Sequence, residues 1–83
     1  MTLEELRKSA FVVGMKETER ALERGEAVHV LIGSDCDVRV SAPITERCRT
    51  AGIPVTSSFT KKELGKACGI KVKAAAAAVL KSR

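Results

Sequence analysis

The chain has 83 residues, of which 45% are hydrophobic, so it can form one small domain over residues 1–83 with a modest core. Its only aromatic residues are Phe11 and Phe59, so base stacking on Trp or Tyr is excluded, which counts against the common platforms that bind single-stranded RNA. The net charge of +5 is uneven: residues 61–83 carry seven lysines and arginines against one acidic residue, whereas residues 1–60 carry eight against nine. A polyanionic partner and a solubilising surface explain this basic block equally well.

Cysteine usage and hydropathy indicate the compartment. The three cysteines are widely spaced and form no C-x-x-C pair, so we expect no zinc or other metal site. The chain does not open with a basic and then apolar leader, and no apolar run is long enough to cross a membrane. We therefore expect a cytoplasmic protein with free thiols at Cys36, Cys48 and Cys68.

Two helices and a strand are expected in the first part of the chain. Thr2 and Glu5 have the spacing of a capping box, which predicts a short helix to about Ala10. The β-branched and aromatic residues 11–13 predict a short strand. A second helix is expected over residues 16–24, since a glycine follows it.

The middle of the chain contains the clearest strand. Residues 27–32 are apolar nearly throughout, which places this strand in the middle of a sheet covered on both faces. After a loop over residues 33–37, we expect a helix over residues 41–51 with Pro43 in its first turn.

A short strand and a short helix follow. Residues 53–57 predict a strand at the edge of the sheet, because Pro54 lacks an N–H to donate. Thr60 and Glu63 form a second capping box that opens a helix over residues 61–68.

The alanine-rich segment 74–80 has two interpretations. Intrinsic propensity favours a helix. A central strand of small residues is the alternative, because it would let helices approach both faces of a sheet closely. With either interpretation, the alternation of helices and strands predicts the α/β class and a three-layer α/β/α sandwich.

The junction after the first strand is a candidate binding site. Gly14 permits a sharp turn and leaves room for a ligand, and the first turn of the next helix presents backbone N–H groups suited to phosphate. Lys16 and Arg20 share one face of this helix, with Glu17 beside them. The alternative is an ordinary solvated helix face with an internal ion pair.

Several blocks, in a specific order and spacing, carry a resemblance over residues 11–80. They are Gly14-Met15-Lys16-Glu17-Thr18-Glu19-Arg20, Ala27–Asp35, Gly52–Val55, and Lys61–Gly69 followed by Ile70-Lys71-Val72. They resemble the kink-turn-binding ribosomal protein family, which includes archaeal and eukaryotic large-subunit proteins, a core protein of small nucleolar RNPs and short bacterial relatives.

The resemblance implies a fold and a ligand. The fold is a four-stranded mixed sheet between helices, in which residues 74–80 form a strand. The ligand is kink-turn RNA, a sharply bent internal loop with tandem sheared G·A pairs. The residues carried over from the family are Gly14, Lys16, Glu17, Arg20, Ile70, Lys71 and Val72. We add Met15, Lys61, Lys62 and Lys66 to the expected RNA-binding residues.

The chemistry of the helix start fits such a ligand. A sheared pair leaves the guanine O6/N7 edge free, and Lys16 or Arg20 can donate to it. Glu17 can accept from an exocyclic amino group and would repel the phosphates of a regular duplex. Many family members have Asn at the position of Lys16 and a small polar residue at that of Glu19. We therefore expect weaker base specificity and stronger phosphate attraction at Lys16.

The later block supplies charge and apolar surface. Its lysines can neutralise the phosphates that a bent backbone concentrates, and Ile70 and Val72 can pack against unpaired bases. Ile70 and especially Val72 could instead be core residues of the following strand. Asp35 is expected to accept hydrogen bonds from nearby N–H groups, and Gly65 indicates close approach of RNA or of a neighbouring element.

The sequence therefore predicts a monomeric, non-enzymatic RNA-binding protein without a cofactor. Its partner would be a structured RNA with a kink-turn, such as ribosomal RNA or a riboswitch, and the protein would be associated with the ribosome rather than with a membrane. Two alternatives remain open: an RNA-recognition domain related to RNA-modifying methyltransferases, and a protein-interaction module within an RNP.

Overall fold

The computed structural model describes residues 1–81, so Arg83 of the basic block lies outside the described part of the chain. Helices and strands alternate along the sequence. They are α1 (Leu3–Lys8), β1 (Phe11–Val13), α2 (Met15–Glu23), β2 (Ala27–Ile32), α3 (Val38–Ala51), β3 (Val55–Thr56), α4 (Lys61–Ala67) and β4 (Ala76–Leu80).

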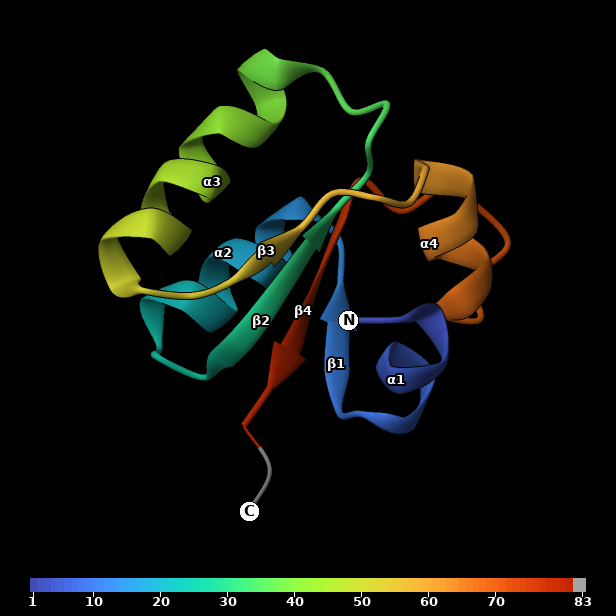
Figure 1. The fold of residues 1–83 in the computed structure, drawn as a ribbon, viewed down its shortest axis with the longest axis horizontal. Coiled ribbons are helices and arrows are strands. Elements are labelled where there is room, and N and C mark those ends of the chain that lie inside the picture. Colours follow the sequence, from blue (N-terminus) through green and yellow to red (C-terminus); the bar gives the residue numbers. More distant parts are fainter. Residues whose placement is uncertain (82–83) are drawn as a thin grey trace.

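The strands form one mixed sheet in the order β1-β4-β2-β3. β4 is antiparallel to both β1 and β2, whereas β2 and β3 are parallel. α2 and α3 cover one face of this sheet, and α1 and α4 cover the other (Figure 1). The predicted α/β/α sandwich with a four-stranded mixed sheet is therefore confirmed.

Each face of the sheet has its own hydrophobic core, because successive strand residues point to opposite faces. The core on the α2/α3 side is made of Ala21, Ala27, Val30, Ile32, Ile44, Cys48, Ala76 and Ala78. The core on the α1/α4 side is made of Leu6, Leu31, Leu64, Ala67, Ala74 and Val79. The sheet is thus covered on both faces, as the apolar β2 sequence predicts.

The alanine-rich segment forms the strand β4 despite its helical propensity. Ala76, Ala77 and Ala78 are fully buried, and β4 pairs along both of its edges, with β1 and with β2. Its small side chains leave space for helices on both faces. Tertiary packing therefore overrides local propensity here, and the helical interpretation of this segment is wrong.

The predicted start of α3 is also wrong. The helix begins at Val38, three residues earlier than expected, because the Asp37 side chain accepts a hydrogen bond from the N–H of Arg39 and caps it. Pro43 consequently lies inside the helix and not in its first turn. Within residues 1–81, no helix has both the length and the apolar character needed to cross a membrane.

Candidate nucleic-acid interface

Two segments far apart in the sequence meet at one end of the sheet. Because β4 is antiparallel to β1 and β2, it begins where they end. The N–H of Gly14 donates to the carbonyl of Ala76 at 2.8 Å, and the N–H of Gly33 donates to the carbonyl of Ala75 at 2.9 Å. The junction between β1 and α2 therefore lies next to the residues that follow the 70–73 loop.

The start of α4 is tied to the same end of the sheet. The N–H of Ala74 donates to the carbonyl of Lys61 at 3.0 Å, and the N–H of Lys61 donates to Oδ1 of Asp35 at 2.8 Å. This hydrogen bond lowers the pKa of the Asp35 carboxyl. The expectation that Asp35 accepts hydrogen bonds from nearby N–H groups is confirmed.

Gly14 opens α2 in a conformation that favours glycine. Its φ of 106° is positive, and no side chain caps the helix start. An added Cβ would meet no atom within 4 Å. The space beside Gly14 is therefore open, and the dipole of α2 favours an anion at this end of the helix.

The polar side chains of α2 are solvated beside this opening. Lys16, Glu17 and Arg20 are exposed, and Nη1 of Arg20 lies 3.3 Å from Oε1 of Glu17. An ion pair this exposed adds little to stability and can exchange partners at low cost. Met15 differs from its neighbours, because it is half-buried and packs against the core on the α2/α3 side.

The loop after α4 borders a hollow at this end of the sheet. The hollow has a volume of about 680 Å³ and is lined by Lys62, Lys66, Ile70, Lys71, Val72 and Lys73. Ile70 is 36% exposed and Val72 is 71% exposed. The interpretation of Val72 as a core residue is therefore wrong. Lys73 was not among the predicted site residues, although it directly follows them in the sequence.

Two glycines let backbone segments approach closely. A Cβ on Gly65 would overlap the carbonyl oxygen of Val72, which shows that the neighbouring loop is the close element. A Cβ on Gly33 would overlap Cγ of Lys61 and come within 3.1 Å of its amide nitrogen. Lys61 is accordingly half-buried, whereas Lys62 and Lys66 are exposed.

Comparison with known proteins identifies the family. The sequence model of the ribosomal protein L7Ae/L30e/S12e/Gadd45 family matches residues 2–83. The chain belongs to this family.

Relatives within the family are similar over most of the chain. The protein is 42% identical over 76 residues to the RNA-binding protein YbxF of Geobacillus stearothermophilus. The aligned region covers 92% of this chain and 93% of YbxF. It is also 42% identical over 67 residues to the RNA-binding protein TTE2299 of Caldanaerobacter subterraneus, and this alignment covers 81% of the present chain and 82% of TTE2299.

Solved structures match the fold. The 15.5kD RNA binding protein of Giardia lamblia superposes with a TM-score of 0.81 at 28% identity. This match covers 88% of the present chain but only 62% of the length of the Giardia protein. A protein of unknown function from Bacillus halodurans superposes with a TM-score of 0.79 at 21% identity over 87% of this chain and 72% of that one, which supports the fold alone.

The ion pairs described for this L7Ae-family protein do not use the cations of α4 or of the 70–73 loop. The ion pairs found within residues 1–81 are Lys8–Glu4, Arg20–Glu17, Arg39–Asp37, Arg47–Glu23 and Arg49–Glu46. In none of these pairs does the cation come from α4 or from the 70–73 loop. The positive charges of α4 and of the 70–73 loop therefore remain available to an external anion.

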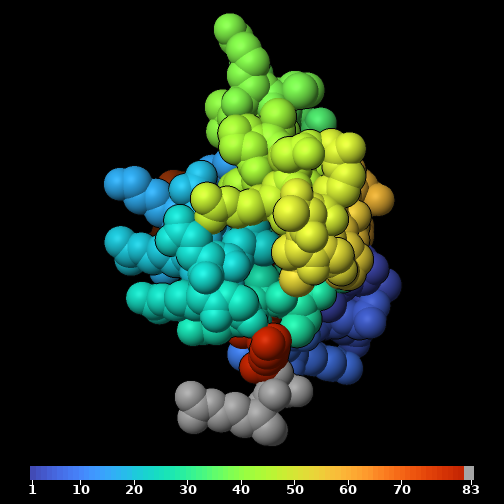
Figure 2. All heavy atoms as spheres, turned by 90° about the vertical axis from the view of Figure 1, so that its left-hand side faces the viewer, coloured from blue at the N-terminus to red at the C-terminus, as the bar shows by residue number. Residues whose placement is uncertain are grey.

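The amino-terminal part of α3 exposes apolar residues that the sequence analysis missed. Val38 is 73% exposed and Val40 is 49% exposed. Figure 2 shows the green part of α3 standing out beyond the rest of this face. Two β-branched residues within three positions of a capping Asp37 are a sequence signal that could have indicated this exposed helix start.

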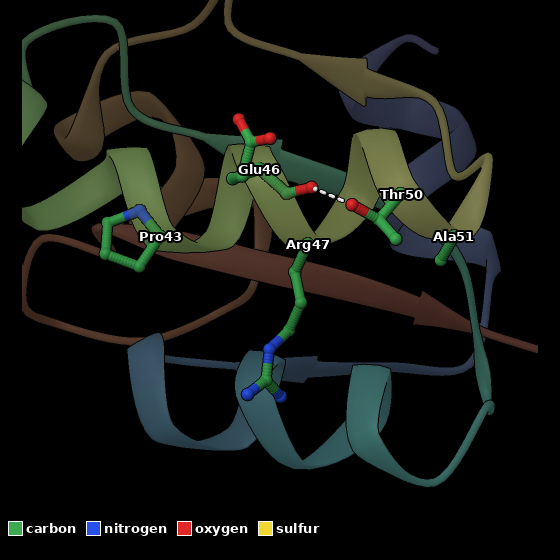
Figure 3. A pocket seen from close by; sticks show the side chains of 5 residues that line it. All are labelled: Pro43, Glu46, Arg47, Thr50 and Ala51. Atoms are coloured by element: carbon green, nitrogen blue, oxygen red, sulfur yellow. Dashed lines mark hydrogen bonds between the residues drawn. The ribbon is translucent and has the colours of Figure 1, made fainter.

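The hollow on the outer side of α3 is less suited to a polyanion. It has a volume of about 450 Å³ and is lined by Pro43, Glu46, Arg47, Thr50 and Ala51. Arg47 points from α3 towards α2 (Figure 3) and lies 3.2 Å from Oε1 of Glu23. No predicted site residue lines this hollow, and it contains an acidic residue, Glu46, beside its one cation.

Proposed function

We propose that this protein binds RNA without catalysing a reaction, and that its ligand is kink-turn RNA with tandem sheared G·A pairs. Membership of the L7Ae family and the names of the RNA-binding relatives support RNA binding. The observation that carries the proposal is the placement of the α2 start beside the loop that leads into β4, through the hydrogen bond from Gly14 to Ala76. One bent RNA could contact both.

The start of α2 would read the G·A pairs. Lys16 and Arg20 would donate to the free O6/N7 edge of the guanines, and Glu17 would accept from an exocyclic amino group. In the unbound protein, Arg20 pairs with Glu17 in solvent, so both side chains can turn to the RNA without disturbing the core. The N–H groups after Gly14 would bind a phosphate.

The 70–73 loop would hold the nucleotides that leave the helical stack. The exposed side chains of Ile70 and Val72 offer apolar surface to unpaired bases. Lys62, Lys66 and Lys71 line the same hollow and would neutralise the crowded phosphates of the bend. Lys61 would contribute less to phosphate binding than to holding the start of α4 in place, because its side-chain stem packs on Gly33.

Binding at both places would stabilise the bent conformation of the RNA over the extended one. The protein would shift the RNA population towards the bend because it contacts surfaces that only the bent state brings together. We further propose that a monomer suffices, that the RNA is ribosomal RNA or another structured RNA, and that the protein acts in the cytoplasm, where its free cysteines stay reduced.

The direct test compares two RNAs at physiological salt. One carries a kink-turn, and the other is identical except that its G·A pairs are replaced by Watson–Crick pairs. We expect tight binding to the first RNA alone. Equal binding to both, with a steep dependence on salt, would mean nonspecific attraction to a basic surface and would refute the proposal. Ribosome association is tested separately, by co-sedimentation of the protein with ribosomes.

A further inference from the structure

Two adjoining hollows connect the candidate interface to the first helix of the chain. The first is the hollow at the 70–73 loop. The second has a volume of about 290 Å³, lies between α1 and α4, and is lined by Leu3, Arg7, Glu63, Lys66 and Ala67. Because Lys66 lines both hollows, they meet along α4. We call the combined surface the α4 groove.

The α4 groove is strongly basic. Five of its lining residues are cations, and within residues 1–81 none of these has an ion-pair partner: Arg7, Lys62, Lys66, Lys71 and Lys73. Its one acidic residue, Glu63, is held at the helix start, where its carboxylate accepts hydrogen bonds from the N–H and hydroxyl of Thr60 at 3.0 and 3.1 Å.

The packing of α1 fixes Arg7 beside α4. Leu6 is fully buried in the same core cluster as Leu64 and Ala67, and α1 starts with a complete capping box. Figure 1 shows α1 and α4 side by side on one face of the sheet. Arg7 therefore belongs to a formed surface, and ordering it on an anion costs little backbone entropy.

We propose that the α4 groove holds the phosphate backbone of one double-stranded arm of the bound RNA. This inference rests on the proposed function and extends it, because it states where an arm runs beyond the bend. α4 has seven residues and spans about 10 Å, and the cations along it continue from the 70–73 loop to α1. A row of unpaired cations fits an extended anion, and contacts to phosphates carry no base information.

Neighbouring residues of α1 provide a matched test. Arg7 lines the α4 groove, whereas Lys8 is 3.4 Å from Glu4 and highly exposed. Arg7→Gln and Lys8→Gln each remove one positive charge from the last turn of α1, so their effects on the helix should be similar. Circular dichroism would confirm that both variants fold. Binding is then measured with three kink-turn RNAs: one with both arms short, and two in which one arm or the other is extended.

We expect Arg7→Gln to weaken binding several-fold to one of the extended RNAs, and to lower the slope of log K against log salt by about one. Its affinity for the short-armed RNA should match that of the unchanged protein. Lys8→Gln should leave all three affinities unchanged. Lys66→Gln should weaken binding to all three RNAs, because Lys66 also lines the hollow at the bend, and it should weaken binding most for the same extended RNA, whatever the base sequence of the arm.

Failure of this inference is distinct from failure of the proposed function. If Arg7→Gln changes none of the three affinities, or changes them as Lys8→Gln does, the arm does not run along the α4 groove, although kink-turn recognition can still hold. If the unchanged protein fails to prefer the kink-turn over its Watson–Crick counterpart, both proposals are wrong.

Discussion

The carbonyl oxygen of Val72 occupies the place that a side chain on Gly65 would need. An added Cβ would overlap this oxygen and lie 3.3 Å from the amide nitrogen of Ala74. The N–H of Ile70 also donates to the carbonyl of Gly65 at 3.1 Å. The shape of the 70–73 loop therefore depends on a residue of α4 that has no side chain.

Gly65→Ala should displace the loop. The overlap is with backbone, which cannot rotate away, so the substitution should lower the free energy of unfolding by about 1–3 kcal/mol, although alanine is the better helix former. Affinity for kink-turn RNA should fall as well, measured by titration at a temperature at which the variant is folded.

Gly52→Ala is the control for this loss of stability. Gly52 ends α3 with a φ of 72°, which strains an alanine, but an added Cβ there meets no atom within 4 Å. We expect lower stability with unchanged RNA affinity. If Gly52→Ala weakens binding as much as Gly65→Ala does, the effect comes from stability and not from the loop.

Arg20→Ala should weaken kink-turn binding strongly without destabilising the fold. Its ion pair with Glu17 is solvated, with side-chain exposures of 61% and 49%, so its loss should change the free energy of unfolding by less than about 1 kcal/mol. Losing a contact to a guanine edge should cost about 1–3 kcal/mol of binding free energy, which titration calorimetry would measure.

Lys81→Ala is the matching charge control for Arg20→Ala. Lys81 follows the carboxyl end of β4, whereas the candidate interface lies where β4 begins. We expect this variant to bind almost normally. Equal losses from Arg20→Ala and Lys81→Ala would contradict specific recognition by α2.

Thr18→Val should stabilise the protein. Thr18 is fully buried in α2, and its hydroxyl has no hydrogen-bond partner among the described residues. An unsatisfied buried hydroxyl costs about 1–3 kcal/mol, and valine has nearly the same shape. Urea unfolding should show a higher midpoint for Thr18→Val. The exposed Thr45, whose hydroxyl donates to the carbonyl of Ser41, should show no such gain when changed to valine.

Stability should decrease in mild acid because of the only histidine. Nε2 of His29 lies 2.7 Å from Oγ1 of Thr56, so the ring is hydrogen-bonded to the neighbouring strand β3. Burial, and then the positive amino terminus, lowers the pKa of His29 below 6.5, against the opposing effect of Glu5. The unfolded chain therefore takes up this proton first as the pH falls below 6.5, and the folded state loses stability.

Replacing the ring isolates this effect. His29→Gln keeps a hydrogen-bonding group but cannot be protonated. Between about pH 7 and pH 5.5, where the carboxylates remain ionised, the free energy of unfolding should fall for the unchanged protein and stay level for the variant. A similar fall in both proteins would show that another group is responsible.

Local signals were sufficient for most of the fold. β1 and β2 begin and end where their β-branched residues predict, and both capping boxes form. β4 could not be derived locally, because alanine favours helix and only pairing with two neighbouring strands makes it extended. The start of α3 was missed because exposed Val38 and Val40 do not have the pattern of a buried helix face.

The sequence suggested which residues to consider for the candidate interface, but not how they are arranged on the surface. The sequence indicated the α2 start and the basic loop separately, and the resemblance linked them. It could not show that Met15 packs inward, or that Lys61 lies on Gly33. It also could not place Arg7 beside Lys66, because this depends on how α1 packs against α4.

The central claim is that the protein holds RNA in a bent state. The most direct measurement is energy transfer between dyes on the two arms of a kink-turn RNA, titrated with protein in parallel with its Watson–Crick counterpart. We predict that transfer rises to saturation for the kink-turn RNA alone, over the concentration range in which binding occurs. Binding without a change in transfer, or the same rise for both RNAs, would contradict the account.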